Sequence, residues 1–399
     1  MADEASATPP KARFWWLDGI KGVSILWIVF FHFFSTFDSG YPWVLDPKFF
    51  PTVIARCAQS SILTALGVIG KSLFIAVTNL AFHSVGVFLV ASGFGLTYSL
   101  AKTGGPKAGW GDWYFQRVVR LFPMYWVAHL VFLISPFVFR PEPIDYRFLL
   151  SFLGDRVYPI ESLFFYFNPA LWFFGLLLQL YLVFPILFRL LQALGAGRFL
   201  IVCGAVTLIT RYLLLGVIPV HGFYLQGGFF GSRLWEFVFG MVLGLFARQQ
   251  PIALEKSLFA KVTLVGAIIA YGLGLACYAI PGAYIFTDPL TGTSLFIILA
   301  HLPIWSPMLR RLASVVTYVG LYSYGLYLLH QPYVLYFGTH MRNLGMLSFV
   351  VLAWVIIALL TVGAIFLERG VNQLTERVLK RGKVNLAMGT PVPMNKTKQ

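Results

Sequence analysis

Charged side chains are scarce in this sequence: Asp, Glu, Lys and Arg together make up 11% of its 399 residues. Soluble domains carry about 25% charged residues, so the composition excludes an ordinary water-soluble domain. Hydrophobic residues reach 58%, and apolar runs long enough to cross a bilayer recur along nearly the whole chain. The sequence therefore predicts an all-α, polytopic integral membrane protein with one membrane domain.

Cysteine is also rare. The three cysteines, Cys57, Cys203 and Cys277, form no CxxC pair and have no histidine cluster beside them, which argues against a disulfide framework or a zinc site. We expect no bound metal and no permanently bound cofactor. A signal peptide is missing too, because the polar, acidic start lacks a basic region and no small-residue cleavage site follows the first apolar run. The first helix is therefore expected to remain as a membrane anchor.

The apolar runs predict ten membrane spans. They lie at roughly residues 20–37, 82–101, 121–139, 171–192, 199–218, 228–247, 262–280, 290–308, 313–336 and 346–367. Residues 60–80 form a further apolar stretch that contains Lys71. Because an eleventh span would invert the orientation of every later helix, we interpret this stretch as a re-entrant or interfacial helix.

Basic residues outnumber acidic ones, 30 to 15. With the N-terminus in the cytoplasm, the ten-span arrangement places most of them in cytoplasmic segments, as the positive-inside rule requires. We therefore expect a multi-pass protein of the cell inner (plasma) membrane with both termini in the cytoplasm. Residues 1–13 would be a cytoplasmic tail, 14–368 the membrane domain and 369–399 a basic tail. That tail is expected to contact anionic lipid, and nucleic acid is not an expected partner.

One histidine stands out in the first predicted helix. Counted from Gly22, His32 lies about 15 Å along the helix, near the centre of a bilayer core about 30 Å thick. A titratable ring at that depth is by default a functional candidate, and a packed polar residue bonded to a neighbouring helix is the plain alternative. Burial favours the neutral ring, which can accept a proton.

Two pairs of charged residues have helical spacing. Arg117 and Arg120 lie three residues apart, so their guanidinium groups share a helix face and suit the oxygens of a diphosphate; a basic cluster at a membrane surface is the alternative. Arg233 and Glu236 have the same spacing and are expected to pair inside the bilayer, either to fix helix packing or to shape a cavity. No chemistry is predicted from residues 262–308.

Several blocks, in order, resemble the acyltransferase 3 family of polytopic membrane acyltransferases. The first block of that family is matched by Arg13, Leu17, Asp18, Gly19, Gly22 and His32, with Lys21 in place of the usual arginine. The later blocks are SVGVFLVASGF, RVVRLFPMYW, ALWFFGLLLQLYLVFP, GSRLWEFVFG, SYGLYLLHQP and FLERG. Gly86, in the first of these, stands where many family members have an aspartate.

The resemblance implies a membrane O-acyltransferase. It would move an acyl group, expected to be acetyl, from cytoplasmic acyl-CoA to a hydroxyl of a periplasmic or cell-envelope acceptor, expected to be a carbohydrate. His32 would be the general base. The donor would be held by Arg117, Arg120, Arg13 and Lys21. The other substrate-binding residues implied are Trp172, Tyr181, Arg233, Glu236, Ser323, Tyr324 and His330.

Two questions stay open at this point. If the aspartate that Gly86 replaces orients the histidine in other members, another acid must do so here, and Asp38, Asp18 and Glu236 are the candidates. The alternative function belongs to another class: a proton-coupled transporter would also place ionisable residues inside the bilayer. The sequence shows no matched pair of interrupted helices in its two halves, which argues against the transporter.

Overall fold

The chain folds into a body of helices. The computed structural model describes residues 14–140, 142–156, 160–218 and 225–381, and no strand occurs in these ranges. Within them, seven helices are long and apolar enough to cross a membrane, or nine if two sharply bent pairs each count as one span. The polytopic helical membrane protein expected from the sequence is confirmed, and the number of ten spans stays a prediction.

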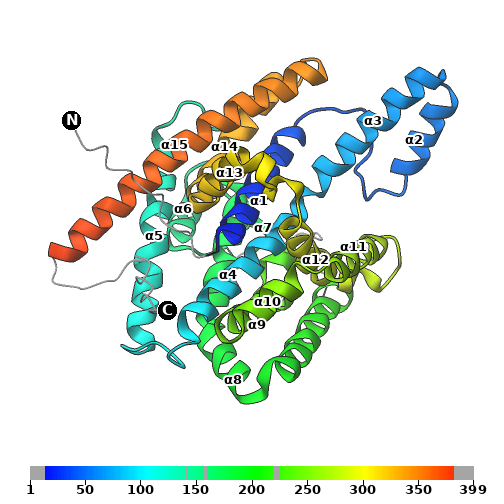
Figure 1. The fold of residues 1–399 in the computed structure, drawn as a ribbon. Helices are drawn as coiled ribbons and strands as arrows, with labels where there is room; N and C mark the ends of the chain where they lie inside the picture. The colour runs from blue at the N-terminus through cyan, green and yellow to red at the C-terminus, as the bar shows by residue number, and fades with distance from the viewer. Residues whose placement is uncertain (1–13, 141, 157–159, 219–224, 382–399) are drawn as a thin grey trace, which may run out of the picture.

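Helix α4 lies at the centre of the body (Figure 1). This helix, Ser84–Leu100, packs against α1 (Trp15–Phe34), α9 (Leu234–Gln249) and α12 (Thr287–Ala300). The other α-helices are α2 (Phe49–Ala58), α3 (Ile62–Asn79), α5 (Trp110–Ile134), α6 (Tyr146–Leu153), α7 (Ile160–Leu163), α8 (Trp172–Tyr212), α10 (Pro251–Leu258), α11 (Lys261–Ala276), α13 (Arg310–Leu321), α14 (Ser323–Met341) and α15 (Met346–Arg381).

The apolar stretch expected to re-enter or lie along the membrane is helical, but it does not fold back. Helix α3 continues through the short turn Leu80–His83 into α4, so Ile62–Leu100 is a single candidate span of 39 residues. Its length is about 58 Å, nearly twice the bilayer core of about 30 Å. Figure 1 shows α2 and α3 projecting from the body as a hairpin. The extra helix is therefore continuous with the second span, because no glycine or proline interrupts residues 71–85. A position along the membrane surface stays a prediction.

Two of the predicted spans, 171–192 and 199–218, are the two arms of α8. The helix turns back at Gly195, whose φ of 72° and ψ of 166° lie outside the helical region. Glycine adopts a positive φ at little cost because it has no side chain. The arms 172–194 and 196–212 diverge from this point and form the V at the lower edge of Figure 1.

Glycines let α4 and α9 approach closely. A Cβ atom added at Gly93 would overlap the backbone carbonyl of Phe237, and one added at Gly240 would overlap the carbonyl of Val90. Small residues at such crossings are the usual means of close helix packing in membranes. Gly93 and Gly240 therefore set the short distance between α4 and α9.

The predicted span 313–336 is two helices that meet at an angle of 80°, with Tyr322 at the break. Helix α15 braces this bend. The Glu368 carboxylate accepts a hydrogen bond of 2.8 Å from the N–H of Gly325 in the first turn of α14, where backbone N–H groups lack helical partners. The Arg369 guanidinium lies 5.6 Å from the centre of the Tyr322 ring.

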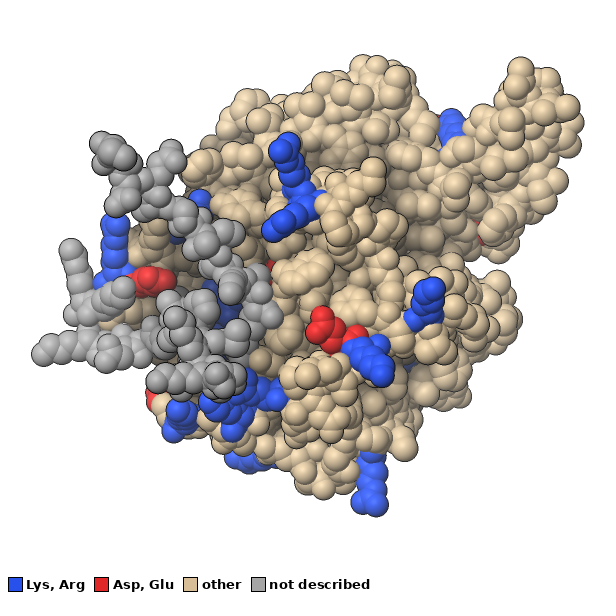
Figure 2. Space-filling model, viewed as in Figure 1, with Lys and Arg blue, Asp and Glu red and all other residues tan. Residues whose placement is uncertain are grey.

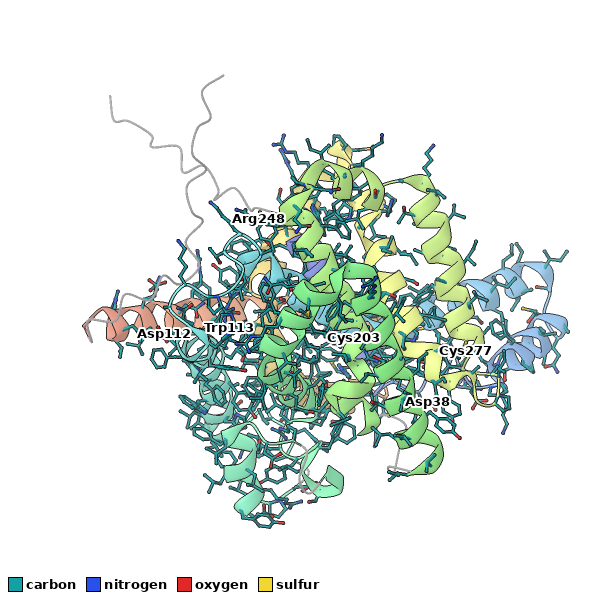
Figure 3. The ribbon with its side chains drawn as sticks, turned by 90° about the horizontal axis from the view of Figure 1, so that it is seen from below. Asp38, Asp112, Trp113, Cys203, Arg248 and Cys277 are labelled. Carbon is teal, nitrogen blue, oxygen red and sulfur yellow. The ribbon has the colours of Figure 1, made fainter. Side chains whose placement is uncertain are left out.

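The body has two distinguishable ends. The hairpin end carries α2 and α3, and the loop end carries residues 101–109, which join α4 to α5. Figure 3 shows Asp38 at the hairpin end, and Asp112 and Trp113 at the opposite, loop end. On the face shown in Figure 2, basic side chains gather toward the loop end, and the projecting hairpin shows few.

Candidate functional site

A large cavity follows α4 from one end of the body to the other. Its volume is about 1370 Å³. Its lining runs from Phe82, in the turn before α4 at the hairpin end, to Thr103, in the turn after α4 at the loop end. The lining residues within α4 itself run from Val85 to Leu100, 15 helical steps or about 22 Å, so the cavity extends over most of a bilayer core about 30 Å thick. The cavity also brings together side chains of α1, α5, α8, α14 and α15.

Cations line the cavity toward the loop end. Lys21 of α1 and Arg117 and Arg120 of α5 all face it. The Lys21 Nζ atom lies 2.6 Å from Asp18 Oδ1, and the Arg117 guanidinium lies 5.4 Å from the centre of the Trp113 ring. Among the described residues, no carboxylate lies within 4 Å of either arginine, so both charges are available to an anion. Arg13, predicted to join this group, lies outside the described residues.

His32 faces the same cavity, in the last turn of α1. The helix begins at Trp15 rather than near Gly22, so the ring lies about 26 Å from the helix start instead of near its middle. Along α1, about 16 Å separates His32 from Lys21. The histidine therefore lies toward the hairpin end, well away from the cations.

None of the acids proposed to orient His32 reaches it. Asp18 pairs with Lys21, Asp38 accepts a hydrogen bond from the N–H of Gly40, and Glu236 lies against Arg233. In the described part of the chain, no carboxylate lies within 4 Å of a nitrogen of His32. Gly86, the position of the family's aspartate, packs against the backbone of Gly292. Within the described ranges, the rings beside His32 are those of its chain neighbour Phe31 and of a second histidine.

That second imidazole belongs to His330, which falls in the last third of the predicted span 313–336. Because α14 begins only at Ser323, after the bend, His330 lies near the middle of a helix and is buried. The centres of the His32 and His330 rings lie 5.3 Å apart. The His330 Nδ1 atom lies 2.8 Å from the Tyr327 carbonyl and 3.2 Å from the Leu326 carbonyl.

Four more predicted substrate-binding residues line the cavity, and two of them already have a hydrogen-bond partner within the protein. The Tyr324 hydroxyl donates to the Leu121 carbonyl at 2.8 Å, and the Tyr181 and Ser92 hydroxyls lie 3.0 Å apart. Trp172, at the start of α8, also lines the cavity, and its ring stacks on that of Phe164. Ser323 lines the cavity at the start of α14.

A cluster of four buried charges lies beside the cavity. Arg233 Nε lies 3.2 Å from Glu236 Oε1, which confirms the predicted pair. Asp288 bridges two arginines, with its Oδ1 2.6 Å from Arg233 and its Oδ2 2.5 Å from Arg211. Arg233 and Asp288 line the cavity, whereas Glu236 does not. The two positive and two negative groups balance one another inside the protein.

Sequence analysis missed two acids at this site. No chemistry was predicted for the region of Asp288, although an acid inside an apolar helix is itself a reason to expect a function or a partner. Glu368 was noted only as part of a family block, yet it lines the cavity where α15 braces the bend. Both lie far in sequence from their partners, so no local spacing revealed them.

Comparison with known proteins identifies one relationship. A family model described as an acyltransferase domain matches residues 14–368, nearly the whole chain. No curated protein and no solved structure matches the chain.

Proposed function

Because the chain belongs to the acyltransferase 3 family, we propose that it is a membrane O-acyltransferase that moves an acetyl group from acetyl-CoA to a hydroxyl of a cell-envelope carbohydrate. The observation that carries this proposal is a single cavity that is lined both by His32 and by the pair Arg117 and Arg120. Its volume exceeds the roughly 300–1,000 Å³ typical of pockets for one small ligand. Donor and acceptor can therefore meet inside it.

The donor enters from the loop end, which in this proposal faces the cytoplasm. Its phosphates bind Arg117 and Arg120, whose planar guanidinium groups match phosphate oxygens. Lys21 also lines this part of the cavity, but its charge is balanced by Asp18, so the arginine pair supplies the positive charge for the phosphates. The distance of about 16 Å from Lys21 to His32 along α1 must be covered by the donor itself. Acyl-CoA suits this geometry because a long, flexible arm joins its diphosphate to its thioester.

The acceptor enters from the hairpin end. Aromatic side chains of Phe165, Trp172 and Phe173 line the cavity there, and the apolar face of a sugar ring packs well on such rings. Arg233 and Asp288 supply polar groups on the same part of the wall. A sugar hydroxyl held among these residues reaches His32 from the side opposite to the thioester.

The chemistry is acyl transfer with His32 as general base. A nitrogen of the neutral ring takes the proton of the acceptor hydroxyl while the oxygen attacks the thioester carbonyl. The new carbon–oxygen bond forms and the carbon–sulfur bond breaks. The proton then passes from His32 to the sulfur of the departing CoA, which leaves as the free thiol.

The test is a purified sample in lipid nanodiscs, supplied with acetyl-CoA and envelope glycans. Free thiol release and mass spectrometry of the glycans measure transfer. His32→Ala should lower turnover by about 10²-fold or more, as loss of a general base does, while His340→Ala, an exposed histidine on α14, should be unaffected. Unchanged turnover in His32→Ala, with the variant normally folded and inserted, would overturn the assignment. Solute movement into vesicles without acetyl-CoA consumption would favour the transporter instead.

The orientation of the protein has its own test. We propose cytoplasmic termini because the basic side chains gather at the loop end, where the positive-inside rule places the cytoplasm. A reporter enzyme that works only in the periplasm, fused after Gln399, should be inactive. An active fusion would reverse the orientation and place the arginine pair on the wrong side for a cytoplasmic donor.

A further inference from the structure

The two histidines of the cavity differ in how their ring nitrogens are used. His330 lies 2.8 Å from the Tyr327 carbonyl through Nδ1. A carbonyl oxygen only accepts hydrogen bonds, so in the neutral ring Nδ1 carries the proton and Nε2 is left as a lone-pair acceptor. This Nε2 atom is buried and has no hydrogen-bond partner in the described ranges. The neighbouring Gln331 presents a buried Oε1 that also lacks a hydrogen-bond partner there and can only accept, so Nε2 needs its donor from another side chain.

The hydrogen-bond donor that fits is an N–H group of the His32 ring. The ring centres lie 5.3 Å apart, with the planes inclined by 32°, a spacing from which small rotations bring two ring edges within reach of one N–H···N hydrogen bond. Both rings line the cavity. No described carboxylate is placed to orient His32, and Gly86 offers none, so the ring otherwise lacks the third group that usually orients a catalytic base.

We propose that His330 is the positioning residue for His32: its Nε2 accepts a hydrogen bond from one N–H of His32, so that the other nitrogen faces the substrates as a bare base. The proposal rests on the proposed function, in which His32 is the general base. In this proposal a neutral imidazole replaces the carboxylate that orients the histidine in other catalytic arrangements. In those arrangements the third group fixes the tautomer and the orientation of the histidine.

The proton balance of the reaction is unchanged by this arrangement. When His32 takes the hydroxyl proton, it becomes an imidazolium with two N–H groups, one of which stays bonded to His330 Nε2. His330 remains neutral throughout and keeps its own proton on Nδ1. The proton taken from the hydroxyl leaves His32 for the sulfur of CoA.

Other helical histidines show that a hydrogen bond from Nδ1 to a backbone carbonyl does not by itself identify a positioning residue. His129 also bonds to a carbonyl one turn earlier, that of Tyr125. Its Nε2 atom has a partner, however, because it lies 2.9 Å from Ser151 Oγ, and His129 does not line the cavity. His340 bonds in the same way to the Tyr336 carbonyl on the same helix as His330, and it is exposed. His330 combines the free acceptor, the cavity wall and a neighbouring imidazole. His340 is therefore a matched control.

The first test measures kinetics in nanodiscs. His330→Leu removes the acceptor and should lower kcat by about 10²-fold with the KM for acetyl-CoA unchanged. His330→Gln returns a carboxamide oxygen near the position of Nε2, and its kcat should be at least a tenth of that of the unmodified protein. The control variant His340→Leu should have the same kcat as the unmodified protein. In a His32→Ala background, His330→Leu should cost nothing further, because a positioning residue acts only through its partner. Equal losses in both backgrounds would overturn the proposal.

The second test does not depend on activity. Nitrogen-15 NMR of histidine-labelled protein reports the tautomer of each ring, and the His32 signals are identified by their loss in His32→Ala. One tautomer is expected in the unmodified protein and a mixture of two in His330→Leu. A His32 spectrum that is the same with and without His330 would overturn the pairing. If acetyl-CoA is not consumed but the tautomer still depends on His330, the pairing stands and the proposed function fails.

Discussion

Replacing the arginine pair gives the sharpest quantitative prediction. A hydrogen bond to a charged group contributes about 1.5–3 kcal/mol, so each guanidinium that binds a phosphate should contribute about 2 kcal/mol, or about 30-fold in affinity. The double variant Arg117→Ala/Arg120→Ala should therefore bind acetyl-CoA about 10³-fold more weakly. Arg117 should account for the larger share, because it is half-buried over Trp113 while Arg120 is exposed. Lysine at both positions should restore part of the affinity, since a point charge lacks the planar fork.

The assay is a titration of the protein in nanodiscs with acetyl-CoA and, separately, with acetyl-pantetheine, which carries the same thioester but no phosphate. The double variant should lose affinity for acetyl-CoA and keep its affinity for acetyl-pantetheine. The matched control is Arg310→Ala/Arg311→Ala, a pair of exposed arginines on α13 that does not line the cavity. Equal losses for both ligands would mean that the cavity itself is damaged, and an unchanged affinity for acetyl-CoA would refute the phosphate-binding role.

Two further predictions concern stability, both read from thermal unfolding in detergent. Gly93→Ala should destabilise the protein by about 1–3 kcal/mol, because its new methyl group meets the backbone of α9. Gly95→Ala, with open space on the same helix, should leave stability unchanged or raise it by up to about 1 kcal/mol, because alanine favours a helix over glycine. Equal effects would refute the close helix crossing. Asp288→Asn should cost about 3–5 kcal/mol, because it leaves two buried guanidinium groups without their shared carboxylate. A normal unfolding temperature in that variant would show that the arginines find other partners.

Local spacing explains what the sequence could predict of the site. Arg117 and Arg120 face one cavity wall, and Arg233 lies against Glu236, because residues three apart on a helix share a face. His32 was found because a lone titratable residue in an apolar helix is unusual. Each of these inferences depends on the spacing of residues within a single helix, and the structure places the residues on the helix faces that this spacing predicts.

Contacts between distant helices could not be predicted in this way. His32 and His330 belong to helices near opposite ends of the chain, and no pattern within either helix shows that they meet. His330 falls in the last third of the predicted span 313–336, but the bend before Ser323 places it near the middle of α14. Asp288 was overlooked because its two partners, Arg211 and Arg233, come from other elements. The contact between the two histidines, the position of His330 and the partners of Asp288 all depend on how distant helices pack together.

The partners of the arginines differ between the two ends of the cavity, and this difference bears on the proposed position of the anionic donor. Arg211 and Arg233 lie against Asp288 and Glu236, so their charge is neutralised within the protein. Arg117 and Arg120 have no described carboxylate within 4 Å, and their charge is left for a ligand. Where positive charge lacks an internal partner, the potential in a cavity with low-dielectric walls attracts anions. This difference supports the proposal that a phosphate-bearing donor binds at the loop end and that an uncharged acceptor binds beside the balanced cluster.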